Sequence, residues 1–267
     1  MKVFIAADME GLAGLAQWDQ TETELQKQLM TEEVNAAVRG AFAAGAGEVV
    51  AGQSHGTMRF LLPQSLDPRA SMVAGQPKKM NHMGGVDRSF DLAIFVGYHS
   101  KAGTLRGVMA HTFSGQVFAL SFNGIEMGEI GADAALCGYF GVPVGMVSGD
   151  QAACDEAKAL LGNIVTVSVK QGLSRTCALC KPLAVARQEI EQAAARAVSR
   201  AKEFKPFVVK GPVLGQVTFT DTAFADAAEM LPAMQRVDGV TLRWEAKDFL
   251  EAFQLFDVVR PLAKIVK

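Results

Sequence analysis

The sequence has few residues of the kinds that mark secreted, membrane-spanning or nucleic-acid-binding proteins. Its 267 residues include only four cysteines, too few for a disulfide framework, and we expect reduced thiols. No stretch reaches the roughly 18 apolar residues of a membrane span. The 26 basic and 28 acidic residues are mixed along the chain. The sequence therefore lacks the basic patch that would indicate a nucleic-acid partner, and we expect none. The N-terminus, MKVFIAADMEG, suits a buried strand better than a signal peptide, and we expect a cytoplasmic protein without a membrane partner.

Short apolar runs alternate with helical patterns over the first two thirds of the chain. This alternation predicts an α/β fold with a mostly parallel sheet and helices on both faces. Strands are expected at 3–7, 48–52, 91–97, 117–122, 142–148 and 164–169, and helices at about 24–44, 128–140 and 151–161. Asn123-Gly124 predicts a hairpin after the run at 117–122, because both residues tolerate positive φ. The segment 53–90, rich in Pro, Gly and Met, is expected to be a long excursion over the sheet.

The pattern changes after Lys181. An alanine-rich helix is expected at about 182–204, followed by the strand-like segments GPVLGQVTFT and VTLRWEA and by helices near 222–231 and from about 247. We therefore expect an α/β domain over residues 1–180 and a smaller α+β region over residues 181–267.

Histidine is scarce, so the positions of the four histidines are informative. Asp8 and Glu10 directly follow the first predicted strand, His55 follows the second, and His99 follows the strand at 91–97. Ligand sites in open α/β sheets form beyond the carboxyl ends of the strands, so these side chains are expected to converge. Two carboxylates spaced i, i+2 point the same way in an extended backbone and repel each other unless a cation lies between them. With imidazoles nearby, a divalent metal is the simplest such cation.

Glu129 lies in the segment GEIG at the start of a predicted helix, where its carboxylate either seats a metal or complements the helix dipole. Mixed Asp, Glu and His ligation without cysteine suits zinc, manganese or iron in an open, hydrolytic site. Taken singly, each histidine is more often a packed or surface residue, and only their joint placement favours a metal site. His82, inside the irregular segment, has no such placement and is interpreted as incidental.

An ordered set of short motifs runs over nearly the whole chain. The motifs are D-M-E-G at 8–11, T-E-E-V-N at 31–35, S-H at 54–55, G-Y-H at 97–99, G-V-M-A-H at 107–111, G-E-I-G at 128–131, K-Q-x-x-S-R at 170–175 and A-K-D-F-L-E-A at 246–252. Together they resemble the bacterial zinc-dependent D-aminopeptidases of the dipeptide-permease type. The resemblance implies a metallo-aminopeptidase that removes N-terminal D-residues such as D-Ala from short peptides. It also implies two zinc ions per subunit and ten subunits, stacked as two pentameric rings around a channel to which residues 181–267 contribute.

The same resemblance implies a role for individual residues. Asp8 is implied to bridge both zinc ions. Glu10 and His99 would complete one metal site, and His55 with Glu129 would complete the other.

His111 matches the histidine proposed as the catalytic nucleophile or base of that family. Two departures from the family pattern accompany these matches. Gly52-Gln53 stands where the family commonly has Asn-Asp, which removes a carboxylate from the expected surroundings of His55. One extra residue lies between His99 and His111, and this concerns specificity more than chemistry.

Two other functions stay open at this point. A two-metal phosphoesterase uses the same ligand types, and Lys101, Arg106 or Arg175 would supply cationic groups for phosphate. A metal-stabilised oligomer that binds peptides without turnover also fits. Hydrolysis of D-Ala-D-Ala and of p-nitrophenyl phosphate, with and without chelator, separates the three.

Overall fold

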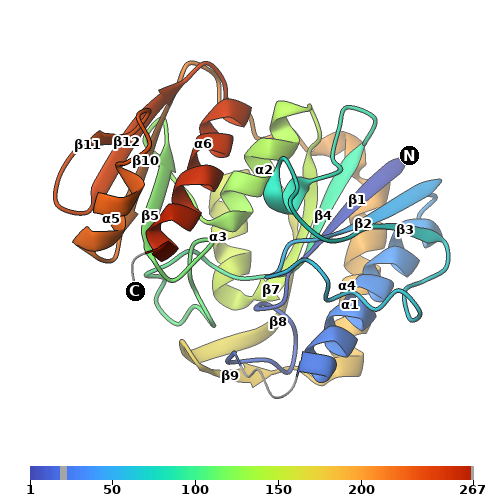
Figure 1. Cartoon of the computed structure of the whole chain (residues 1–267). Helices are drawn as coiled ribbons and strands as arrows, with labels where there is room; N and C mark the ends of the chain where they lie inside the picture. Colours follow the sequence, from blue (N-terminus) through green and yellow to red (C-terminus); the bar gives the residue numbers. More distant parts are fainter. Residues whose placement is uncertain (19–22, 266–267) are drawn as a thin grey trace.

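A largely parallel sheet lies at the centre of the molecule (Figure 1). The computed structural model describes residues 1–18 and 23–265. Seven strands pair in the order β3-β2-β1-β4-β7-β8-β9, and only the β8–β9 pair is antiparallel. They are β1 (Lys2–Ala7), β2 (Glu48–Gln53), β3 (Ala70–Val73), β4 (Leu92–Tyr98), β7 (Val144–Asp150), β8 (Val165–Ser174) and β9 (Cys177–Cys180). The predicted α/β class with a mostly parallel sheet is confirmed.

A second, antiparallel sheet lies beside the first, in the order β11-β12-β10-β5-β6. Its strands are β5 (Val117–Phe122), β6 (Ile125–Glu126), β10 (Val213–Phe219), β11 (Gln235–Arg236) and β12 (Thr241–Ala246). Asn123 and Gly124 connect β5 to β6 with φ values of 51° and 77°, so the predicted hairpin is confirmed.

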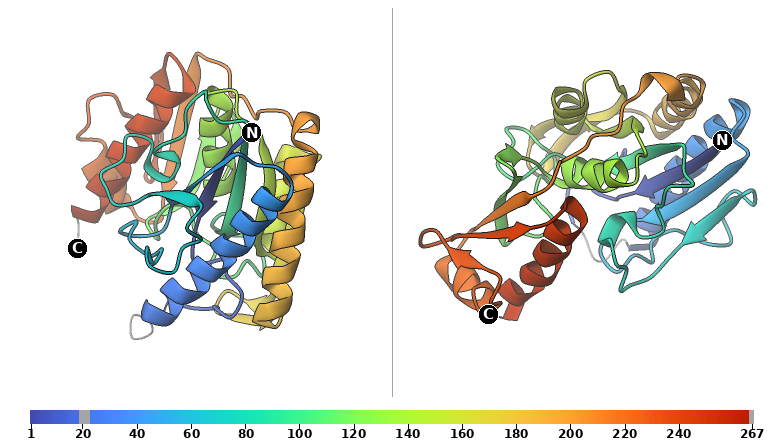
Figure 2. Two further views of the ribbon diagram at one scale, coloured as in Figure 1. Left: turned by 90° about the vertical axis from the view of Figure 1, so that its right-hand side faces the viewer. Right: turned by 90° about the horizontal axis from the view of Figure 1, so that it is seen from above.

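Helices cover both faces of the parallel sheet. Val3 and Ile5 of β1 belong to the core shared with α1 (Thr23–Ala43) and α4 (Leu183–Ser199), which lie side by side in Figure 2. The alternate residues Phe4 and Ala6 face the opposite core. That core is built with α2 (Glu129–Tyr139), α3 (Gln151–Leu161) and α6 (Phe249–Leu262), while α5 (Thr222–Ala228) packs against β10.

Segments from both sides of residue 180 contribute to both sheets' surroundings, and the division of the chain at residue 180 stays a prediction. The β5–β6 hairpin pairs with β10 of the C-terminal part, whereas α4 packs beside α1 on one face of the parallel sheet. The contact is close, because a Cβ at Gly40 of α1 would lie 2.0 Å from the carbonyl oxygen of Glu191 in α4. Both cores are therefore completed only by segments from both sides of residue 180.

The segment 53–90 contains more regular structure than its composition predicts. It contributes β3, which pairs in parallel with β2, and the 3-10 helix η2 (Asn81–Met83). Two further 3-10 turns are η3 (Ala201–Glu203) and η4 (Ala263–Ile265). Within the described ranges, none of the helices has the length and apolar character needed to cross a bilayer.

The turn after β1 packs directly on the end of β4. The backbone N–H of Gly11 donates to the carbonyl oxygen of Gly97 at 2.7 Å. A Cβ at Gly11 would lie 2.0 Å from the carbonyl oxygen of Tyr98, so only glycine permits this approach. The glycine of the D-M-E-G motif thus brings the chain that carries Asp8 and Glu10 next to His99.

Candidate metal centre

The side chains predicted as metal ligands converge at the carboxyl ends of β1, β2 and β4. Asp8 and Glu10 follow β1, His55 follows β2 and His99 follows β4. Glu129, the first residue of α2, reaches the same place from the other side. All but His55 are buried, and the His55 side chain is 16% exposed.

The imidazoles of this cluster lie between carboxylates. Nδ1 of His55 is 2.9 Å from Oε2 of Glu10 and 3.5 Å from Oδ1 of Asp8. Nε2 of His99 is 3.5 Å from Oδ2 of Asp8 and 3.3 Å from Oε1 of Glu129. Asp8 therefore contacts both imidazoles, which is the position that a bridging ligand requires.

Among the residues that the structure describes, two sets of three have ligand atoms within 4.8 Å of one another. The first set, Asp8, Glu10 and His99, agrees with one of the two implied metal sites. In the second set, Glu129 lies with His99 and His111, and not with His55 as the family resemblance implies. The division of ligands between two ions therefore stays a proposal, and the geometry makes His111 a competing ligand.

The atoms left without partners support a cation at this position. Among the described residues, Oδ2 of Asp8 and Nε2 of His99 are buried and have no hydrogen-bond partner, although they face each other. Nδ1 of His99 donates to the carbonyl oxygen of Ser100 at 2.9 Å, which leaves Nε2 free to bind a metal. Buried polar atoms are normally satisfied, so this pair fits a bound cation.

The buried carboxylates and imidazoles of the cluster shift one another's pKa values. Burial and the neighbouring Glu10 raise the pKa of Asp8 to about 6. Burial opposes the charged form of His55, yet Glu10 and Asp8 raise its pKa to about 10. Burial also opposes a charged His99, but Glu129 and Asp8 raise its pKa well above the usual range. The carboxylates thus hold positive charge at the two imidazoles, where a metal ion would replace the protons.

His111 lies against the cluster from the loop before β5. Its ring stacks on that of His99 with centroids 4.0 Å apart, and Nε2 is 3.5 Å from Oε1 of Glu129. Nδ1 donates to the carbonyl oxygen of Met109 at 2.9 Å. Burial and the neighbouring His99 lower the pKa of His111, so its Nε2 is available as a proton acceptor near neutral pH.

His82 is not incidental, contrary to the interpretation from sequence. It is buried in η2, with Nδ1 3.0 Å from Oδ2 of Asp133 and 3.7 Å from Oε2 of Glu129. The hydroxyl of Tyr98 donates to the same Asp133 oxygen at 2.8 Å. Asp133 lies four residues after Glu129 on one helix face, and this spacing is the signal that would have indicated a polar partner beside the ligand.

Gln53 supports the loop that carries His55. Its Oε1 accepts hydrogen bonds from the backbone N–H groups of Phe60 and Leu61, the second at 2.8 Å. The Phe60 ring then packs edge-on against His55 with centroids 4.8 Å apart. The amide at this position, where the family commonly has a carboxylate, orients His55 through Phe60.

Trp18 and Lys170 contact the cluster without having been predicted from the sequence. Nε1 of Trp18 donates to Oε1 of Glu10 at 2.7 Å. The buried Nζ of Lys170 donates to the carbonyl oxygens of Glu10, Leu12 and Leu15 at 2.5, 2.9 and 2.6 Å. Both therefore fix the segment that carries Glu10.

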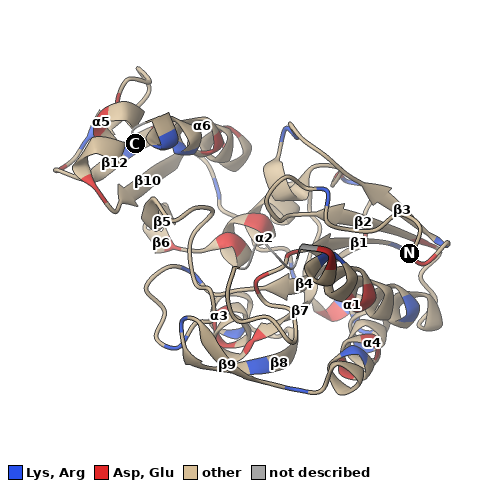
Figure 3. Cartoon of the chain, turned by 60° about the horizontal axis from the view of Figure 1, so that its bottom comes forward, with Lys and Arg blue, Asp and Glu red and all other residues tan. Residues whose placement is uncertain are grey.

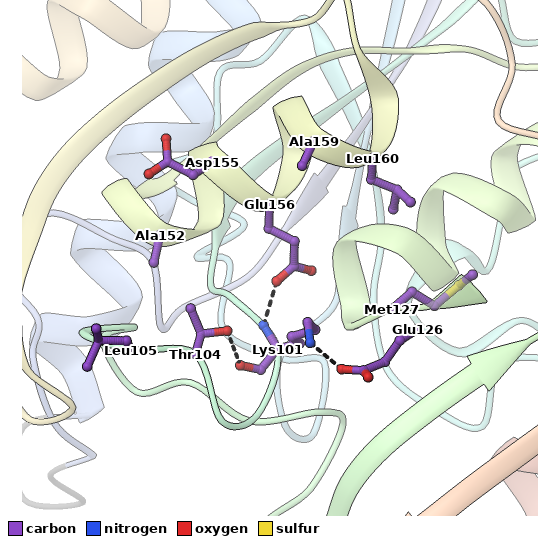
Figure 4. A pocket seen from close by; sticks show the side chains of 10 residues that line it. All are labelled: Lys101, Thr104, Leu105, Glu126, Met127, Ala152, Asp155, Glu156, Ala159 and Leu160. Atoms are coloured by element: carbon purple, nitrogen blue, oxygen red, sulfur yellow. Dashed lines mark hydrogen bonds and ion pairs between the residues drawn. The ribbon is translucent and has the colours of Figure 1, made fainter. Parts of the chain in front are cut away.

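The cations considered for a phosphate ligand occupy different environments. Nζ of Lys101 pairs with Glu126 at a hollow of about 490 Å³ between α3, β6 and the loop after β4 (Figure 4). Among the described residues, none of the five predicted ligands lines this hollow. Arg106 is exposed on the same loop, whereas Arg175 lies over the Trp18 ring. Basic and acidic residues are interspersed along the elements drawn in Figure 3.

Nearly the whole chain is similar to known D-aminopeptidases. The chain matches the peptidase M55 family, described as D-aminopeptidase, over residues 1–258. A D-aminopeptidase of Bacillus subtilis (strain 168) is 34% identical over 271 residues, covering 98% of this chain and 98% of that protein. A solved structure, described as the Zn-dependent D-aminopeptidase DppA from Bacillus subtilis, a self-compartmentalizing protease, is similar with a TM-score of 0.95. It is 33% identical and covers 99% of this chain and 98% of the other.

Proposed function

Because the chain belongs to the peptidase M55 family of D-aminopeptidases, we propose that it is a binuclear zinc enzyme that removes an N-terminal D-residue, such as D-Ala, from short peptides. The resemblance indicated by the sequence motifs is thereby confirmed, as is the class of metallo-aminopeptidase. Family membership favours peptide hydrolysis over a phosphoesterase or a binding protein without turnover. The number of zinc ions, the D-selectivity and the residue roles are our proposals.

The single observation that carries the metal proposal is the buried pair of unpartnered atoms, Oδ2 of Asp8 and Nε2 of His99. We assign Asp8, Glu10, His55, His99 and Glu129 as the ligands of the two ions. When bound, zinc ions would polarise the scissile carbonyl and lower the pKa of water. Asp, Glu and His side chains without cysteine are the donor set of a catalytic zinc site.

In this proposal His111 moves the proton. Its Nδ1–H is held by the Met109 carbonyl, which orients Nε2 toward the carboxylate of Glu129 and the cluster. Nε2 would accept a proton from the attacking water and return it to the leaving amine. The lowered pKa of His111 keeps the imidazole neutral at the start of that cycle.

Metal analysis combined with substrate hydrolysis tests the function. Purified protein should contain about two zinc ions per chain, hydrolyse D-Ala-D-Ala faster than L-Ala-L-Ala and leave p-nitrophenyl phosphate intact. Exhaustive chelation should abolish hydrolysis, and added zinc should restore it. Chelator-resistant peptide hydrolysis without bound metal would exclude the zinc mechanism, and phosphate release would favour the phosphoesterase.

We also propose that the protein is cytoplasmic and forms a closed ring, a decamer of two pentameric rings, that admits short peptides. The self-compartmentalizing relative supports an assembly, and the four free cysteines suit a reducing compartment. Exposed leucines on the loop before β5 and on the β8–β9 hairpin supply apolar surface: Leu105 (86%), Leu173 (62%) and Leu179 (65%). Light scattering that gives a monomeric mass at micromolar concentration would contradict the ring.

A further inference from the structure

Trp18 and Arg175 form an exposed edge beside the metal cluster. The indole ring of Trp18 lies edge-on to His111, with centroids 5.6 Å apart, while its N–H donates to Glu10. The guanidinium carbon of Arg175 lies 5.0 Å from the centre of the same indole ring. Trp18 therefore contacts both Glu10, a proposed metal ligand, and the cation of Arg175.

The guanidinium of Arg175 is held in place through its Nε, while its terminal amino groups have no partner among the described residues. Nε donates to the carbonyl oxygen of Ala110 at 3.2 Å, one residue before His111. Within residues 1–18 and 23–265, no carboxylate lies at ion-pair distance from Arg175, and its two terminal amino groups have no hydrogen-bond partner. A guanidinium fixed by stacking and by Nε presents those amino groups as a planar fork, the geometry that binds a carboxylate with two parallel hydrogen bonds.

The other cations near the site are already engaged. Nζ of Lys170 donates to three backbone carbonyls beneath the Glu10 segment, and Nζ of Lys101 pairs with Glu126. Of these nearby cations in the described part of the chain, Arg175 is the one placed to meet an anionic group of a substrate.

Resting on the proposed aminopeptidase function, we propose that Arg175 binds the free C-terminal carboxylate of the substrate and that Trp18 forms the wall along which the peptide lies. The amino end of the substrate would then lie at the metal cluster and the carboxyl end at Arg175. Arg175 would therefore select short peptides with an unmodified carboxyl end.

A pair of substrates that differ only at the carboxyl end tests this role. The wild type should cleave D-Ala-D-Ala at least about tenfold more efficiently, in kcat/KM, than D-alanyl-D-alaninamide, because the amide lacks the charge-assisted hydrogen bonds. Arg175→Met should lose most of that preference through a higher KM for the acid, and Arg175→Lys should keep part of it. Arg88→Met is the matched control. Arg88 is exposed in the loop that precedes β4, whereas the cluster lies beyond the carboxyl end of that strand.

The side chain of Arg175 also has structural contacts that Arg175→Met removes, to the carbonyl oxygen of Ala110 and to the Trp18 ring. If Arg175→Met slows both substrates by the same factor, or if the wild type shows no preference, carboxylate binding by Arg175 is refuted. Calorimetric affinities of both peptides for the zinc-loaded His111→Ala variant and for His111→Ala/Arg175→Met give the same comparison without turnover. Failure of the wild type to hydrolyse either peptide would contradict the proposed function, while the binding ratio would still decide the role of Arg175.

Discussion

Substitution of His111 is the sharpest test of how the site works, because the structure permits both a catalytic and a ligand role. We expect His111→Ala to fold, to keep its full zinc content and to lose about 10²- to 10⁴-fold in kcat, the usual contribution of a positioned acid or base. That range corresponds to about 2.7–5.5 kcal/mol of transition-state stabilisation.

The contacts of His111 limit what the substitution removes. The ring is 16% exposed and stacks on His99, and its hydrogen bond within the described part of the chain is to the Met109 carbonyl. Loss of that neutral bond costs about 0.5–1.5 kcal/mol of stability, so the protein should stay folded. His111→Asn offers a matched comparison, because its amide can donate to the same carbonyl while it lacks a basic nitrogen at the Nε2 position.

The assays are zinc content after dialysis, thermal unfolding and kcat for D-Ala-D-Ala. If both variants keep their zinc and are equally slow, the missing Nε2 is responsible. If zinc is lost, His111 is a ligand, in agreement with its grouping with His99 and Glu129, and one of the five assigned residues leaves the metal sites. Near-normal turnover with zinc retained would remove His111 from the mechanism.

Three further changes probe the ligands and their supports. Asp8→Ala should lose both zinc ions, as measured by elemental analysis, because Asp8 contacts both imidazoles of the cluster; retention of one ion would show that it does not bridge. His82→Gln should weaken zinc binding about 10- to 100-fold in chelator competition, because its contacts to Glu129 and Asp133 orient a ligand; unchanged affinity would reduce His82 to a packing role. Lys170→Met should lower the free energy of unfolding in urea by about 3–5 kcal/mol, since three buried carbonyls lose a charged donor; a loss below 1 kcal/mol would mean that the turn rearranges or that water replaces the amino group.

The convergence of the proposed ligands was within reach of sequence reasoning because it depends mainly on strand ends. A parallel sheet brings the carboxyl ends of its strands to one edge whatever the loops do, so Asp8, Glu10, His55 and His99 were predicted together. Glu129 was less secure, because a carboxylate at a helix start has an ordinary capping explanation. The structure adds a contact of 3.3 Å between Oε1 of Glu129 and Nε2 of His99, which supports the ligand role that we propose.

Residues that act through tertiary contacts were not predictable from local patterns. His82 lies in a segment without periodicity and meets Asp133 across 51 positions of sequence. The packing of α4 against α1 was not predicted for the same reason. The alanine-rich sequence predicts a helix but does not indicate which element that helix packs against. β3 was missed because four half-exposed residues carry too little alternation to mark an edge strand.

The polar residues Glu33 and Lys170, in the motifs T-E-E-V-N and K-Q-x-x-S-R, show why a motif need not carry chemistry itself. Glu33 is buried in α1, and its Oε1 accepts the N–H of Ala13 at 2.8 Å. Burial raises the pKa of Glu33 to about 7 and lowers that of Lys170 to about 8, so each is costly to bury in its charged form. Both contact the backbone of the turn after β1, whose own hydrogen bonds include Leu12 N–H to the Met9 carbonyl at 3.2 Å and Leu15 N–H to the Leu12 carbonyl at 3.5 Å. The two buried groups supply further partners for the backbone of this turn, and we expect them to help hold Glu10 at the cluster and Trp18 beside it.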